Sequence, residues 1–159
     1  SHKRRCLKAQ IQKLYQKLHY IRKDFCQQTA NAIARTVGMV YVEDLKVRNM
    51  TASAKGTIEK PGQQVKQKSG LNKAMLRFSP HQWVSSLEWA LLKHGGYVTK
   101  VNPAYTSQTC PSCGHCEKEN RPTQAKFECR QCGYTNNADV VGAINVLNRG
   151  RTVPSMPAE

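Results

Sequence analysis

The apolar residues of the first 25 positions recur at spacings of four and three, which place them on one side of an α-helix. They are Leu7, Ile11, Leu14, Leu18, Ile21 and Phe25. Lys, Arg and Gln lie between them, and neither Gly nor Pro occurs before Gly38. Residues 3–37 are therefore predicted to form one long amphipathic helix with a basic face. The heptad spacing suits a coiled-coil dimer as well as packing against the rest of the domain.

Two later segments have the pattern of β-strands. Residues 39–45 (MVYVEDL) are apolar and β-branched and follow Gly38, a typical helix stop, so they fit a buried strand of a mostly parallel sheet. Residues 97–101 (YVTKV) alternate as a half-buried strand does, and Pro103 ends them. A mixed α/β fold follows from these strands and the helices around them.

Three other segments complete the pattern. Residues 51–69 are rich in Lys, Gln and Gly, which predicts a mobile basic loop. Ser79 is expected to be the N-cap of a helix that begins with Pro80, with Gln82 completing a capping box. Residues 138–148 read as a final helix, and the tail after Gly150 is expected to be disordered.

The chain carries a formal net charge of +15, and the charge is uneven. Residues 1–80 hold 17 Lys and Arg against 4 acids, a net +13, whereas the remainder holds 8 against 6, a net +2. Such a surface attracts phosphate backbones, because binding releases their counterions. A solvated surface or an anionic membrane surface remains an alternative by composition alone.

Hydropathy indicates a protein that does not enter the membrane. The longest apolar stretch, residues 37–42, is far shorter than the roughly 18 residues of a membrane span. The basic N-terminus also lacks the apolar core of a signal peptide. We therefore expect a soluble, cytoplasmic protein.

Four of the seven cysteines form two tight pairs. Cys110 and Cys113 are separated by two residues, as are Cys129 and Cys132, and a glycine follows each pair. This spacing lets four thiolates bind one Zn²⁺ at about 2.3 Å in a closed, structural site, as in a zinc ribbon. Cys116 lies close enough to compete for the ion, but its spacing is poorer and we expect it not to bind.

Two acids in this basic chain are candidates for chemistry. Glu43 ends the first strand, at the edge where a parallel sheet usually builds its site; a solvated charge at a strand exit is an equal alternative. Asp139 opens the final helix, where an acid also interacts favourably with the helix dipole. From the residues alone, the second interpretation is preferred for Asp139.

Four runs of sequence resemble the C-terminal half of TnpB proteins, which are transposon-associated RNA-guided nucleases related to miniature type V CRISPR effectors. These runs are VEDLKVRNM (42–50), YTSQTCPSCG (105–114), FECRQCGY (127–134) and ADVVGAINVLNRG (138–150). Their order and number make the resemblance specific. It extends from the long basic helix to about Gly150.

The resemblance implies an incomplete RuvC-like domain of the RNase H fold with an inserted four-cysteine zinc ribbon. It implies that Glu43 and Asp139 are the second and third catalytic carboxylates and bind Mg²⁺ or Mn²⁺ for phosphodiester hydrolysis in the complete protein. DNA is then the expected partner, guide RNA is expected for the full-length family member, and the protein is expected at the nucleoid.

The same resemblance implies a domain organisation. The RuvC-like part would occupy residues 1–103, including the basic loop 51–69. The ribbon, of the kind that binds target nucleic acid, would occupy residues 104–135, and the last RuvC helix residues 136–150. A disordered tail would follow at 151–159.

The sequence departs from the family pattern in two places. The family's first catalytic Asp lies on a strand before the long helix, and no acid here replaces it, since Asp24 is on the helix and Asp44 would point away from Glu43. Val141 and Gly142 stand where the family commonly has Asn and Ala. We therefore expect the chain alone to bind nucleic acid and to cleave poorly. A non-catalytic nucleic-acid-binding zinc-ribbon protein is the alternative.

Overall fold

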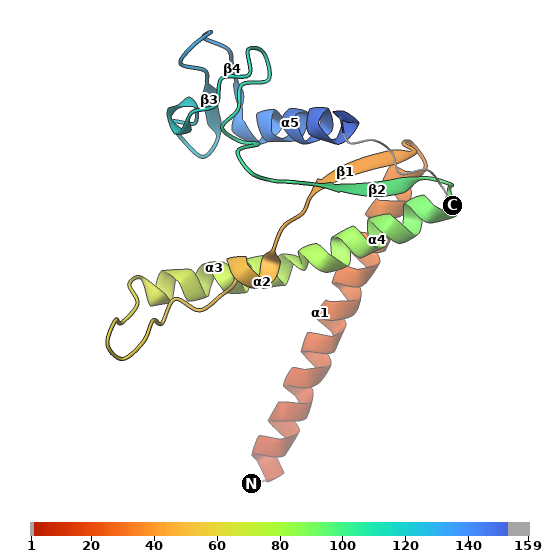
Figure 1. Ribbon diagram of the computed structural model, residues 1–159. Helices are drawn as coiled ribbons and strands as arrows, with labels where there is room; N and C mark the ends of the chain where they lie inside the picture. The colour runs from red at the N-terminus through yellow and green to blue at the C-terminus, as the bar shows by residue number, and fades with distance from the viewer. Residues whose placement is uncertain (1, 153–159) are drawn as a thin grey trace. The chain divides into compact units, whose positions relative to one another are not determined.

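The computed structural model describes residues 2–152 as a helix-rich mixed α/β chain (Figure 1). Its contacts divide the chain into two units, which are described separately. The first unit comprises the described residues up to 39 together with 46–97, and the second comprises 40–45 and the described residues from 98 onward. No helix in the described part is long and apolar enough to cross a membrane.

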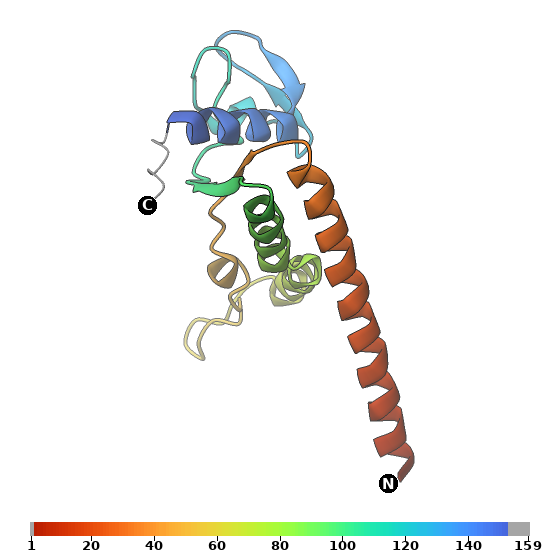
Figure 2. The same cartoon turned by 90° about the vertical axis from the view of Figure 1, so that its right-hand side faces the viewer.

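Helix α1 (His2–Ala34) packs beside α4 (Pro80–Lys93) in the first unit (Figure 2). The buried residues of this pair lie one helical turn apart and are mostly small, which lets the two helices approach closely. They are Cys26, Ala30 and Ala34 on α1, and Leu87, Ala90 and Leu91 on α4. Helix α1 ends at Ala34, three residues before the predicted end at residue 37. The amides of Thr36 and Val37 both donate to the carbonyl of Ile33 in the turn that follows.

The predicted apolar stripe of α1 is not the face that packs against α4. Leu14 is 63% exposed and Phe25 is 66% exposed, and the other members of the stripe are exposed as well. The residues that contact α4 lie on a different side of the helix, because Cys26 is rotated by about 100° from Phe25. The heptad pattern thus predicted the helix correctly but not its buried face.

The predicted basic loop 51–69 is shorter than expected, because its last residues are helical. It follows a single turn, α2 (Val47–Met50), and ends where α3 (Val65–Phe78) begins. Lys68 donates from Nζ to the carbonyl of Met50 at 2.6 Å, and Asn72 donates from Nδ2 to the carbonyl of Thr51 at 2.8 Å. These bonds attach α3 to the residues just after α2.

Ser79 separates α3 from α4 but does not cap α4 as predicted. Its φ of 52° lies in the left-handed region, and its hydroxyl donates backward to the carbonyl of Leu76 at 3.2 Å. The capping box with Gln82 is absent, because no side chain caps α4. Pro80 does occupy the first turn of α4, where its missing N–H costs nothing.

Strands β1 (Met39–Glu43) and β2 (Tyr97–Val101) form a two-stranded sheet. The amide of Tyr97 donates to the carbonyl of Gly38, and the amide of Asp44 donates to the carbonyl of Val101. Residue numbers rise together along both strands, so the strands are parallel, as the pattern of residues 39–45 predicted. Glu43 lies at the carboxyl end of β1.

The second unit continues from β2 into the cysteine-containing segment and the last helix. This segment holds the 3₁₀ turn η1 (Lys118–Asn120) and an antiparallel hairpin of β3 (Lys126–Glu128) and β4 (Thr135–Asn137). Helix α5 (Ala138–Thr152) follows β4 directly. Two residues of the predicted tail 151–159 therefore belong to α5, and residues 153–159 lie outside those that the structure describes.

Gly150 provides a test of how α5 packs within the second unit. A Cβ at this buried position would overlap the ring of Tyr41, whereas a Cβ at Gly142 on the same helix would meet nothing within 4 Å. We expect Gly150→Ala to lower the free energy of unfolding by about 1–3 kcal/mol. Gly142→Ala should raise it by about 0.5–1 kcal/mol through helix propensity. Thermal and urea unfolding measure both, and equal effects would contradict the packing.

Candidate metal centre

Each pair of cysteines lies on a turn of the same geometry. In the first turn the amide of Cys110 donates to the carbonyl of His115 at 2.8 Å, and the amide of Gly114 donates to the carbonyl of Cys110 at 2.9 Å. The second turn repeats both bonds around Cys129, at 2.8 and 3.0 Å. Gly114 and Gly133 have φ values of 78° and 71°, which other residues adopt only with strain. The glycines therefore allow both turns.

The two turns bring four sulfur atoms together. The Sγ atoms of Cys110 and Cys132 are 3.6 Å apart, as are those of Cys113 and Cys129, and all four lie within 4.8 Å of one another. A tetrahedron with metal–sulfur bonds of about 2.3 Å has edges of about 3.8 Å. The cluster therefore has the dimensions needed to hold one metal ion such as Zn²⁺, with every coordination position taken by sulfur.

The thiols of the cluster differ in acidity before any cation is present. Burial raises the pKa of Cys129, but hydrogen bonds from the amides of Cys132 and Gln131 and from neighbouring thiols outweigh it and lower the pKa to about 6. For Cys113, the amide of His115 lowers the pKa, but burial and the three other thiols raise it to about 12. The four thiols therefore titrate as a coupled set, in which the hydrogen bonds around Cys129 favour a negative charge.

Cys116 lies outside the cluster, as expected from its spacing. It is exposed, and its backbone pairs with that of Thr109 in an isolated antiparallel β-bridge just before η1. The four-cysteine group is the one set of three or more His, Cys, Asp or Glu side chains within residues 2–152 that could hold a metal ion.

Asn120 joins the two halves of the cysteine segment and was not singled out from the sequence. Its side chain is fully buried. Its Nδ2 donates to the carbonyls of Gln108 at 2.9 Å and His115 at 3.2 Å, and its Oδ1 accepts from the amide of Arg130 at 2.9 Å. One amide side chain therefore fixes both cysteine turns relative to each other. A buried amide with three backbone partners leaves no local sequence pattern.

The ribbon and α5 share one apolar core. Phe127 and Val141 are fully buried beside Ala138 and the buried cysteines, and Tyr134 packs edge-on to Phe127 with ring centres 6.3 Å apart. The first turn of α5 thus supplies two of the five buried residues of this core, Ala138 and Val141, so the helix begins directly where β4 ends.

Asp139 lies in the first turn of α5, as predicted. Asn137 caps the helix, because its Oδ1 accepts from the amide of Asp139 at 2.8 Å and from that of Val140 at 3.4 Å. The Asp139 side chain is 83% exposed and lies 3.6 Å from Arg121, a loose ion pair at the surface. The carboxylate is therefore accessible to solvent and is held near a cationic side chain.

Glu43 is connected to α5 through Thr106. The buried Thr106 hydroxyl donates to Oε1 of Glu43 at 2.7 Å, and it also lies 3.0 Å from the carbonyl of Pro103. The carbonyl of Thr106 accepts from Nδ2 of Asn145 on α5 at 2.8 Å, and the same Nδ2 donates to the carbonyl of Thr109 at 2.7 Å. Arg149 adds a bond to the carbonyl of Ala104 at 2.9 Å.

Helix α5 thus carries Asp139 and also holds Thr106, which contacts Glu43. The structure records no contact between the two carboxylates. Glu43 reaches α5 through Thr106, whose partner Asn145 lies six residues, about 9 Å, along the helix from Asp139. Thr106 and Asn145 were not predicted as site residues. The run that contains Asn145 resembles the family motif, and that is the only signal in the sequence that could have pointed to it.

Two family models match different parts of the chain. Residues 1–54 match a model described as a probable transposase, OrfB_IS605, and residues 81–146 match the Cas12f1-like TNB domain. The chain is therefore TnpB-like and related to the Cas12f nucleases. The second match spans the cysteine cluster, the ribbon and most of α5.

Individual relatives agree with these models. The putative RNA-guided DNA endonuclease InsQ of Escherichia coli K12 is 46% identical over 146 residues, 92% of this chain and 36% of InsQ. Cas12f1 of Sulfoacidibacillus thermotolerans, a CRISPR-associated endodeoxyribonuclease, is 51% identical over 49 residues, 31% of this chain and 12% of the relative. The chain thus spans about a third of the length of InsQ.

Solved structures show the same fold. A Cas12f1 chain from a complex with sgRNA and target DNA superimposes with a TM-score of 0.62 at 27% identity, covering 92% of this chain and 39% of the other. CasPhi-2 (Cas12j), bound to crRNA and phosphorothioate DNA, gives a TM-score of 0.57 at 28% identity, covering 91% and 21%. The chain therefore has a Cas12f-like fold.

Replacing Cys110 tests the metal centre and its coupling to α5. We expect Cys110→Ser to reduce bound zinc from about one ion per chain to near zero and to unfold the last helix with the ribbon. Elemental analysis and hydrogen exchange of α5 amides measure the two effects. Cys116→Ser is the control and should keep its zinc. Normal protection of α5 in Cys110→Ser would show that the ribbon and the helix fold independently.

Asn120 offers a second test, which leaves the cysteines intact. Asn120→Ala removes three hydrogen bonds to the ribbon backbone, among them the one that the amide of Arg130 donates, and should cost roughly 2–4 kcal/mol. Its effect appears as faster metal release to a chelator and as a lower melting temperature. The exposed Asn148→Ala on α5 should change stability by less than about 0.5 kcal/mol. Similar behaviour of both variants would argue against a bridging role for Asn120.

Proposed function

We propose that this chain is the RuvC-like and zinc-ribbon part of a TnpB-like RNA-guided DNA endonuclease, which hydrolyses phosphodiester bonds with divalent metal in the complete protein. One observation carries the proposal: a single buried residue, Thr106, connects the carboxylate of Glu43 to α5, the helix that carries Asp139 in its first turn.

The four cysteines are proposed to hold one structural Zn²⁺. The sulfur separations of 3.6 Å fit a tetrahedral ion, and the all-sulfur donor set is typical of zinc that stabilises a fold. Because no position remains for a substrate, the ribbon would act by positioning α5 and by presenting a surface to target nucleic acid. The ion itself would take no part in hydrolysis.

Glu43 and Asp139 are proposed to be two catalytic carboxylates that bind Mg²⁺ or Mn²⁺. Carboxylate oxygens suit these hard cations, which when bound would activate water and stabilise the leaving oxygen. The Thr106 hydroxyl occupies one side of Glu43 Oε1 and so orients the carboxylate. Asn137 fixes the backbone at Asp139 and leaves its exposed side chain available for a ligand.

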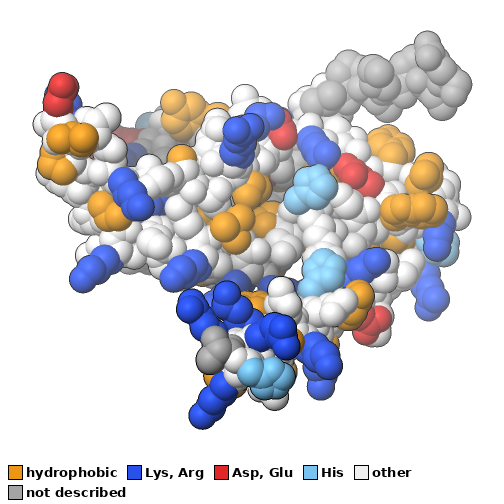
Figure 3. Space-filling model, turned by 90° about the horizontal axis from the view of Figure 1, so that it is seen from below, with side chains coloured by type: hydrophobic (Ala, Val, Ile, Leu, Met, Phe, Trp, Pro, Cys, Tyr) orange, Lys and Arg blue, Asp and Glu red, His pale blue; other side chains and the backbone are white. Residues whose placement is uncertain are grey.

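The basic first unit is proposed to supply the electrostatic attraction for DNA and guide RNA, which would keep the protein at the nucleoid. On the face drawn in Figure 3, Lys and Arg cover much more of the surface than Asp and Glu. The chains that it resembles were solved with guide RNA, and Cas12f1 also with target DNA. Affinity should fall steeply with salt, because counterions are released on binding.

In this proposal the RuvC-like part comprises residues 1–103 and the last helix, as the resemblance implied. The ribbon corresponds to residues 104–135. Helix α5 then extends the predicted segment 136–150 to Thr152. The parallel pairing of β1 with β2 supports an RNase H-type sheet at this point of the chain.

A metal titration tests the two carboxylates. Mn²⁺ binding, followed by electron paramagnetic resonance on the zinc-loaded chain, should weaken at least fivefold in Glu43→Gln and in Asp139→Asn. Each substitution removes a charged oxygen ligand while keeping the shape of the side chain. The loop variant Glu59→Gln makes the same change at an acid of the first unit that is not proposed as a ligand, and it serves as the control.

The outcome separates this proposal from the alternative, a non-catalytic zinc-ribbon protein that binds nucleic acid. The exposed Asp139 and its ion pair with Arg121 favour that alternative, because an ion pair at the surface needs no catalytic role to explain it. Equal Mn²⁺ affinity in all four proteins would support it.

We also expect little cleavage of single-stranded DNA by the 159-residue chain alone with Mg²⁺ or Mn²⁺. Robust cleavage that is lost in Glu43→Gln would refute our view that its site is incomplete.

A further inference from the structure

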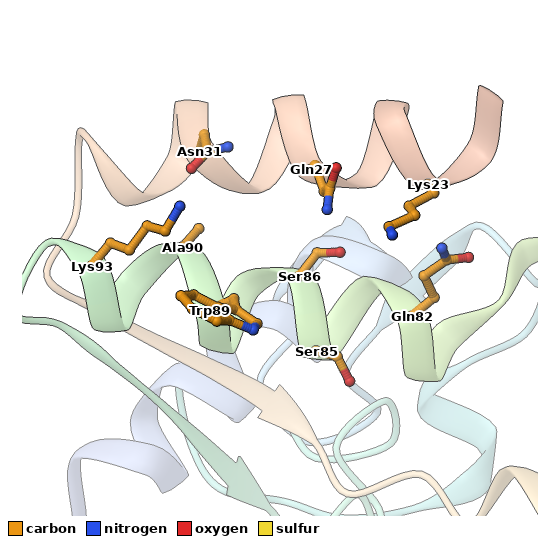
Figure 4. Close-up of a pocket in the computed structure, with 9 residues that line it drawn as sticks. All are labelled: Lys23, Gln27, Asn31, Gln82, Ser85, Ser86, Trp89, Ala90 and Lys93. Atoms are coloured by element: carbon orange, nitrogen blue, oxygen red, sulfur yellow. The ribbon is translucent and has the colours of Figure 1, made fainter. Parts of the chain in front are cut away.

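A groove of about 510 Å³ runs between α1 and α4 in the first unit, and its lining includes none of the four cysteines of the cluster and neither Glu43 nor Asp139 (Figure 4). Lys23, Gln27 and Asn31 line it from α1 at intervals of four residues, so they form one row along the helix. The row is about 12 Å long, which is the length of roughly three stacked nucleotides. The volume is in the range of sites that bind nucleotide-sized ligands.

The lining of the groove is cationic and rich in hydrogen-bonding groups. Lys23 approaches from α1 and Lys93 from α4 (Figure 4). None of the lining residues that the structure describes is acidic. The amides of Gln27, Asn31 and Gln82 each offer both a donor and an acceptor, which base edges require. The groove therefore attracts an anion and can also hydrogen-bond to uncharged polar groups.

The one aromatic side chain of the groove is exposed. Trp89 lies on α4 and is 66% exposed, although the indole is among the most apolar groups in the chain. The ammonium of Lys93 lies 5.3 Å from the centre of its ring, a cation–π contact that holds a positive charge beside an aromatic face. An exposed aromatic beside a cation is the combination that binds a base and its phosphate together.

We infer that this groove binds a short stretch of single-stranded nucleic acid, with a base stacked on Trp89 and phosphates near Lys23 and Lys93. An apolar protein helix fits less well, because Trp89 and Ala90 are the only apolar residues that line the groove. Duplex DNA also fits less well, since its bases are stacked inside and cannot reach the indole. The amides of α1 would then contact base edges.

The inference adds a binding site to the proposed function and does not involve the carboxylates. It shares with that function only the expectation that the chain binds nucleic acid. Binding without cleavage is therefore the appropriate measurement.

Fluorescence anisotropy with labelled single strands of about 12 residues tests the groove on the full 159-residue chain. The probes are oligothymidine, oligouridine and an abasic deoxyribose-phosphate strand of the same length. Trp89→Ala should bind oligothymidine or oligouridine roughly five- to hundredfold more weakly than the unsubstituted chain. The abasic strand should bind both proteins equally, because it has no base to stack. The tighter of the two base-containing strands identifies the polymer, DNA or RNA.

Two further variants keep the test independent of folding. Trp89→Phe retains an aromatic face and should bind within about threefold of the unsubstituted chain, whereas Trp89→Leu retains only bulk and should behave like Trp89→Ala. Lys23→Gln should weaken binding of all three strands and lower the salt slope by about one. All variants should melt at the same temperature, since Trp89 is exposed.

Equal affinity of Trp89→Leu and Trp89→Phe for the base-containing strands would overturn the inference. So would an equal loss for the abasic strand. In either case the Mn²⁺ titration of Glu43→Gln and Asp139→Asn still decides the proposed function, because it does not depend on the groove.

Discussion

Four sulfur atoms that lie within 4.8 Å of one another constrain the whole second unit. As thiolates they repel each other, and as thiols they form only weak hydrogen bonds, so the cluster is stable only when a cation compensates its charge. Few large side chains surround it: Phe127 is the largest that is fully buried. A metal ion in the cluster would therefore replace the apolar core that so short a segment cannot build. Hydrogen bonds from the amides of Cys132 and Gln131 lower the pKa of Cys129 and so favour a thiolate in the cluster.

From this centre, a continuous set of contacts extends to the predicted carboxylates. The apolar core of the ribbon includes the start of α5, and Asn145 and Arg149 hold the same helix to the segment that follows β2. That segment contains Thr106, which contacts Glu43. The ribbon thus determines the position of α5, and α5 helps to determine the environment of Glu43. In the proposed function, an ion held by the four cysteines would therefore influence hydrolysis through the position of α5 and not by contact with the reacting phosphate.

Features encoded by short spacing were predictable, and features that depend on distant residues were not. The cysteine spacing and the glycines specified both turns, and the run 39–45 specified a parallel strand. Thr106 and Asn120 were missed, because their partners are carbonyls and a carboxylate at positions that no local pattern relates. The apolar stripe of α1 correctly indicated a helix. It did not indicate the buried face, because the face that packs against α4 carries the small residues Ala30 and Ala34. At Ser79, a left-handed backbone replaced the expected cap, since α3 extends up to it.

The absence of a linker between β4 and α5 has a consequence for how this segment can vary in length. An extra residue at the start of α5 would rotate the helical residues beyond it by about 100° relative to β4. Asp139 would then face a different direction, and Val141 would leave the core. By contrast, residues 121–125 form a connection between η1 and β3 in which extra residues would shift neither cysteine turn. Related chains should therefore vary in length between η1 and β3 and keep a constant length between β4 and α5.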